Sequence, residues 1–147
     1  MRERAILALL RVARIREREA WEESRMLLAR EADCRAGWRK ASGERFRARE
    51  RLFRAARGGV RGEELRFRSL WVERLSREEE LARAQLREAE RRAGEGLASY
   101  RERKREVRIL ELLQKRIRQR EEERKRRAWA RLLDDLALSR WAGERQW

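Results

Sequence analysis

The sequence contains no proline and no histidine, and its only cysteine is Cys34. Without proline, nothing in the chain forces a long helix to stop. Without histidine, the usual general base and the commonest metal ligand are missing. A single cysteine excludes an internal disulfide framework and a zinc cluster. There is also no phosphate-binding loop and no nucleophile beside a base. We therefore expect no enzymatic activity, no catalytic residue, no metal and no cofactor.

Apolar and aromatic residues are scarce, since aromatics make up 7% of the chain and charged residues 47%. The longest early apolar run, residues 5–10, is too short for a signal peptide or a membrane span. The chain is therefore expected in the cytoplasm. A composition this charged fits either a disordered chain or a long coiled coil with a narrow apolar seam.

A seven-residue repeat of apolar residues favours the coiled coil. Stepping by seven from Ile6 meets only apolar residues as far as Ala55, with Cys34 among them as a buried thiol. The same step from Leu65 reaches Val107, and its companion line ends at Ile117. Such lines are typical of the buried seam between paired helices.

The two repeats are separated by the run Gly58-Gly59-Val60-Arg61-Gly62. We interpret this run as a turn, with Gly58 in the left-handed conformation that ends a helix. The alternative is a weak point in one continuous helix. The sequence thus predicts an all-α fold and one domain, 1–147. In it, helix 3–57, turn 58–62 and helix 63–141 form an antiparallel coiled-coil hairpin. Folding about residue 60 pairs large with small residues in most layers, but it places Ala41 opposite Glu79, a layer that does not fit.

The first helix has no residues left to pair with the second beyond Ile117, so the segment 118–141 should overhang. Three successive glutamate–base pairs should support it, and its helix should end near Gly143. The overhang carries a second apolar stripe, made of Trp129, Leu132, Leu133, Leu136 and Trp141. An uncovered stripe marks a partner site or self-association, such as a homodimer of the isolated protein. A fold-back of the first residues is a further alternative.

The formal net charge is +15, and 38 of the 42 basic residues are arginine. A polyanion partner such as nucleic acid or an acidic membrane surface is one interpretation. Basic and acidic residues alternate, however, which places glutamates wherever phosphates would lie. This pattern favours a solvated surface over nucleic-acid binding. Near the turn, Trp71 either packs over the seam or forms a second contact patch.

Several stretches of the chain match a pattern known from other coiled coils. The most specific is the ending Leu133-Asp134-Asp135-Leu136-Ala137 with Arg140. The others are Leu9-Leu10-Arg11-Val12, Arg16 to Glu19, Gly59-Val60, Glu64-Leu65, Trp71-Val72 with Leu75, Arg101 to Lys104 and Leu110 to Leu113. In these stretches the chain resembles the FliJ family, the stalk proteins of the flagellar type III export apparatus, and more distantly the YscO/SctO group of virulence systems. The family favours glutamate at the position of Asp135.

The resemblance implies a stalk that promotes assembly and activity of a hexameric export ATPase and links it to the membrane export gate and to export chaperones. It implies an ATPase contact at the overhang, through Trp129, Leu132, Leu133, Leu136 and Trp141, and a gate contact at Trp71 and Leu75. Such a protein is cytoplasmic and peripherally associated with the inner membrane, and it has no small-molecule substrate. The alternative is a basic coiled coil that binds nucleic acid or serves as a general scaffold.

Overall fold

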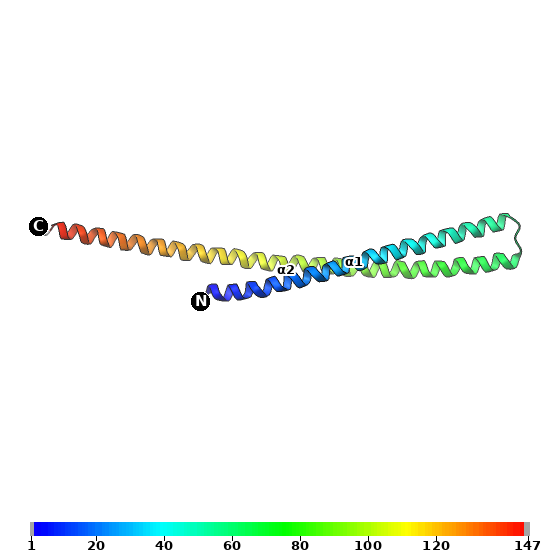
Figure 1. Cartoon of the computed structure of the whole chain (residues 1–147), viewed down its shortest axis with the longest axis horizontal. Coiled ribbons are helices and arrows are strands. Elements are labelled where there is room, and N and C mark those ends of the chain that lie inside the picture. Colours follow the sequence, from blue (N-terminus) through cyan, green and yellow to red (C-terminus); the bar gives the residue numbers. More distant parts are fainter. Residues whose placement is uncertain (1, 146–147) are drawn as a thin grey trace. The chain divides into compact units, whose positions relative to one another are not determined.

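The computed structural model describes residues 2–145, and all but the short turn in this part of the chain is helical. Helix α1 comprises Arg2–Arg57 and helix α2 comprises Gly62–Arg145 (Figure 1). No strand occurs among these residues. Neither helix contains a stretch of the length and apolarity that crossing a membrane requires, within the residues described. The prediction of an all-α chain with two long helices is confirmed.

The turn between the helices lies where the glycine run predicted it. The amide of Val60 donates to the carbonyl of Ala55 over 3.4 Å, which is the six-residue hydrogen bond of a Schellman ending. The residue with positive φ is Gly59, at 74°, and not Gly58 as predicted. Gly58 instead keeps a helical hydrogen bond, from its amide to the carbonyl of Arg54 over 2.9 Å. Glu63 and Glu64 then lie in the first turn of α2, where carboxylates favour the helix dipole.

The far end of α2 differs from the prediction. The helix was expected to end near Gly143, but it continues through this residue to Arg145. Gly143 has no positive φ, the conformation by which a glycine usually ends a helix. A glycine in a helix interior costs only about 1 kcal/mol relative to alanine, so flanking residues can carry a helix through it.

The contacts divide the chain into two compact units. One consists of Arg18–Glu102, which includes the turn, and the other of the residues up to Glu17 together with those from Arg103 onward. Each unit is described separately below. The prediction of a single hairpin domain remains a prediction.

In the unit Arg18–Glu102, burial follows the seven-residue lines. No seam position of either helix is exposed there, and the most buried include Ser24, Ala48, Leu75, Ala89 and Ala93. Cys34 is half-buried and carries a free thiol. Small residues dominate, so the helices approach closely. A Cβ added at Gly96 would lie 2.7 Å from Cδ1 of Leu27 and 3.7 Å from Cα of Ser24.

Two further contacts in this unit join the helices at or beside the seam. The rings of Trp21 and Tyr100 meet at 5.1 Å between centroids. Glu79, which was expected to face Ala41 without a fitting partner, instead forms an ion pair with Arg45. The side chain of Glu79 is 17% exposed and that of Arg45 is 33% exposed, so the seam contains a largely covered charge pair.

In the unit formed by the two chain ends, the core consists of Ile6, Leu10 and Ala13 from α1 and Val107 from α2. Leu10 is only 1% exposed. Ion pairs flank this core, between Arg14 and Glu111 at 3.5 Å and between Glu3 and Arg118 at 3.2 Å. Ile117 is the last residue of α2 in the described chain that is not exposed. Burial therefore stops where the heptad pattern stops.

Candidate partner-binding surfaces

The segment of α2 after Ile117 is a helix without cover. We call residues 118–144 the overhang, and every one of them is exposed. Of the three glutamate–base pairs expected to support it, only Glu123–Arg127 forms, at 3.3 Å. Such an exposed pair contributes only about 0.2–0.5 kcal/mol. The helix is thus held mainly by its continuity with the paired turns before it, since an added residue propagates a helix far more easily than a new one nucleates.

All five predicted contact residues of the overhang lie on its surface. We call them the apolar stripe, and each is between 55% and 66% exposed: Trp129, Leu132, Leu133, Leu136 and Trp141. The first four follow the i, i+3, i+4, i+7 spacing that places side chains on one helix face. Trp141 extends this face from Leu133, and the two line a shallow hollow together with Leu136 and Arg140.

Most of the apolar stripe lies on one face of the helix. At 100° per residue, Trp129, Leu132, Leu133 and Leu136 fall within about 100° of one another, and Trp141 lies at the edge of this face, next to Asp134. An exposed apolar face is costly to keep in water, at about 25 cal/mol per Å² of apolar surface. Exposed apolar patches of this kind mark interaction sites. The arrangement can bind a partner but has no group for covalent chemistry.

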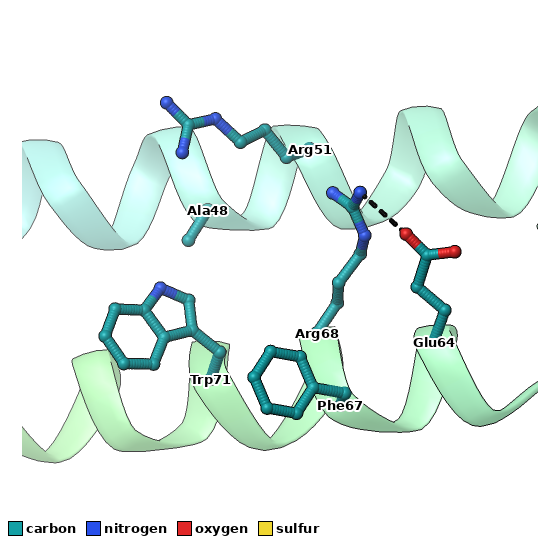
Figure 2. A pocket seen from close by; sticks show the side chains of 6 residues that line it. All are labelled: Ala48, Arg51, Glu64, Phe67, Arg68 and Trp71. Atoms are coloured by element: carbon teal, nitrogen blue, oxygen red, sulfur yellow. Dashed lines mark hydrogen bonds and ion pairs between the residues drawn. The ribbon is translucent and has the colours of Figure 1, made fainter.

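A second surface lies near the turn, in the other unit. The side chain of Trp71 projects from α2 toward Ala48 of α1, the ring of Phe67 lies along α2 beside it, and all three residues line a hollow of about 380 Å³ (Figure 2). Arg68 lies beside Phe67 and forms an ion pair with Glu64, while the guanidinium of Arg74 lies 5.6 Å from the centroid of the Trp71 ring. Trp71 therefore packs over the seam with one side and leaves 46% of its surface exposed.

Leu75, the other predicted gate residue, does not share this surface. It lies on the buried seam line and is 5% exposed. Its contact with a partner would require the helices to separate. The exposed apolar neighbours of Trp71 are instead Phe67 and Leu70, at 70% and 57% exposure. The surface near the turn therefore consists of Phe67, Leu70 and Trp71.

Sequence reasoning missed a third set of exposed apolar residues, in the unit of the chain ends. They lie outside the seam lines on both helices: Leu9, Val12, Ile15, Ile109, Leu112 and Leu113. A second apolar line beside the seam was the signal that could have identified them. Together with the apolar stripe, these residues mean that the unit exposes more large apolar side chains than it buries in its core.

Among the described residues, no group of three or more histidine, cysteine, aspartate or glutamate side chains could hold a metal ion. The carboxyl of Glu88 on α2 has a clearly perturbed pKa, although its side chain is 46% exposed. Hydrogen bonds from Arg91 and Arg92 lower its pKa to about 2. This shift reflects surface ion pairing and identifies no reactive site.

Comparison with known proteins gave no match to any family model, curated protein or solved structure. Evidence on the function of this chain therefore comes from its own surfaces.

Proposed function

We propose that the chain forms an antiparallel coiled-coil hairpin whose second helix extends beyond the first. In both units, residues further along α1 contact residues that come earlier in α2, as in an antiparallel pair. Examples are Glu3–Arg118, Arg14–Glu111, Trp21–Tyr100 and Arg45–Glu79. The lack of exposure along the seven-residue lines supports the same arrangement, because knobs-into-holes packing covers those positions first.

We propose further that the protein is a non-enzymatic stalk of a type III protein export apparatus, flagellar or virulence-associated. Its overhang would bind the hexameric export ATPase and promote assembly and activity of the ring. The observation that carries this proposal is the apolar stripe, which lies on a stretch of α2 where every residue from 118 to 144 is exposed. A ring of subunits around a single helix covers such a stripe and leaves the rest of the stalk free.

The surface of Phe67, Leu70 and Trp71 would then contact the membrane export gate from the other unit. Its aromatic side chains supply contact area at low conformational cost, as at many transient interfaces. In this proposal the protein is cytoplasmic, associates peripherally with the inner membrane at the export apparatus and also contacts export chaperones.

The double variant Leu133→Asp/Leu136→Asp tests the ATPase site. Both leucines are more than half exposed, at 59% and 57%, so the substitutions should leave helical content unchanged. They should abolish stimulation of ATP hydrolysis by the cognate export ATPase, because two charges in the contact face cannot be desolvated without a partner.

The matched control is Leu70→Asp/Leu81→Asp, which makes the same chemical change at two leucines that are 57% and 62% exposed in the other unit. This control should stimulate hydrolysis as the unchanged protein does. Normal stimulation by Leu133→Asp/Leu136→Asp would refute the assignment of the site.

A further inference from the structure

Four arginines converge on a hollow in the unit Arg18–Glu102. Arg35 and Arg39 come from α1, and Arg83 and Arg87 come from α2, so both helices contribute a pair spaced by four residues. The hollow has a volume of about 330 Å³ and is also lined by Trp38, Leu86 and Glu90. Residues four apart are neighbours on a helix surface, and like charges at that spacing destabilise the helix. Both helices thus carry a like-charged pair at the same place, and the pair on α2, Arg83 and Arg87, forms no ion pair with a carboxylate among the described residues.

The hollow contains more hydrogen-bond donors than acceptors. Arg35 is occupied, since its guanidinium pairs with Glu31 at 2.9 Å and with Glu90 at 3.4 Å. The three other guanidinium groups form no hydrogen bond or ion pair with the described residues. The indole nitrogen of Trp38 is enclosed and likewise has no acceptor within the described chain. The available polar groups are therefore all donors, and the one carboxylate present is already paired.

We propose that this hollow binds the phosphate groups of a small polyanion, such as a nucleoside triphosphate or inorganic polyphosphate. Guanidinium groups donate two parallel hydrogen bonds to phosphate oxygens, and such charge-assisted bonds are about twice as strong as neutral ones. Bound phosphates would remove the repulsion between the arginines of each pair.

Size favours a short chain of phosphates over a protein helix. A hollow of about 330 Å³ lies at the lower end of the range for small-molecule sites, about 300–1,000 Å³. Two or three linked phosphates present several negative charges within that space. A carboxylate side chain carries one charge, so several would have to enter together to neutralise the same three guanidinium groups.

The test is calorimetric titration of the full chain with tripolyphosphate and, separately, with ATP, at fixed ionic strength. We expect one binding site per chain. The variant Arg83→Gln/Arg87→Gln should weaken binding at least about tenfold, because it removes two charge-assisted contacts.

The matched control is Arg120→Gln/Arg124→Gln, which lowers the net charge equally on the exposed overhang and should leave the affinity unchanged. Equal affinities for the two ligands would show that the triphosphate alone is recognised, whereas tighter binding of ATP would add a contact to its base.

An equal loss of affinity in both double variants would overturn the proposal, since binding would then follow net charge alone. So would a lack of binding by either ligand. A poly-glutamate peptide that binds through Arg83 and Arg87 when tripolyphosphate does not would show that the site takes protein carboxylates instead.

Discussion

Residues 62–117 and residues 118–144 belong to one helix, α2, and have a similar density of charge, but their surroundings differ completely. In the first stretch an apolar or small residue is covered at nearly every seam position, whereas in the second no residue is covered. Charge density therefore does not decide which part of such a helix is paired. The decisive features are the seven-residue lines and the presence of α1 residues to meet them, which end with Glu3 beside Arg118.

The same substitution should lower the free energy of unfolding strongly in the first stretch and hardly at all in the second. Leu86 is 8% exposed and Leu133 is 59% exposed. Leu86→Asp places an unpaired charge in the seam and should lower the free energy of unfolding by about 3 kcal/mol or more. Leu133→Asp should change it by less than about 0.5 kcal/mol. Thermal unfolding followed by circular dichroism measures both. Equal melting temperatures for the two variants would show that Leu86 is no better covered than Leu133.

Ion pairs should follow the same division. Glu79 and Arg45 are largely covered, whereas the side chains of Glu123 and Arg127 are 64% and 73% exposed. A double-mutant cycle on the covered pair should give a coupling of about 1–2 kcal/mol, because removing one partner leaves the other charge enclosed. The exposed pair should give about 0.2–0.5 kcal/mol. A coupling in the covered pair no larger than in the exposed one would indicate that Glu79 reaches water.

Two glycines of α2 allow a further comparison, within the paired stretch. A Cβ atom added at Gly94 would have no neighbouring atom within 4 Å, whereas one added at Gly96 would lie 2.7 Å from Cδ1 of Leu27. Gly94→Ala should stabilise the protein by up to about 1 kcal/mol through helix propensity. Gly96→Ala should lose at least this gain, because the side chain of Leu27 must move to make room.

Chemical denaturation of the two glycine variants gives the difference between them. Adding Leu27→Ala to Gly96→Ala should relieve the crowding and so reduce the cost of the alanine. Equal stability of Gly94→Ala and Gly96→Ala would show that the helices do not approach closely here.

The smallest effect concerns Glu88, an exposed carboxylate in the paired stretch. Its folded-state pKa is about 2, below the ordinary value of 4.5, because Arg91 and Arg92 donate hydrogen bonds to it. A depressed pKa adds stability above the unfolded value, and this stability is lost as the pH falls from about 4.5 toward 2. Glu88→Gln should make the stability curve slightly flatter in that window.

High salt should remove this difference, since exposed charges are screened. Direct titration of the Glu88 carboxyl by NMR is the sharper measurement. A value near 4.5 would contradict the pairing with Arg91 and Arg92.

The sequence alone predicted the two helices, the turn and the covered lines, because a seven-residue repeat can be recognised from the order of the residues without a structure. It placed Ala55 and Val107 on those lines, and both are buried. It did not identify the partner of Glu79, because folding about residue 60 gives only a nominal position, and the long side chain of Arg45 reaches past it. Gly58 and Gly59 are equally able to adopt a positive φ, so only the hydrogen bonds of the turn distinguish them.

The candidate sites also differ in whether the sequence could predict them. Exposure of Trp129 and Leu133 followed from counting the residues left in the first helix, and the structure places both on the surface. The arginine hollow could not be predicted. Arg39 and Arg83 are far apart in sequence, and only the three-dimensional arrangement brings them to one place.

The central claim is that the overhang binds and activates an export ATPase, and the most direct test is the hydrolysis rate of the cognate enzyme with this protein titrated in. The full chain should be compared with a version ending at Ile117, which keeps every covered position of α2 within the described chain. The account predicts stimulation by the full chain and none by the shorter one. If neither stimulates while both fold as helices, the account is contradicted, and nucleic-acid binding or a general scaffold becomes the better explanation.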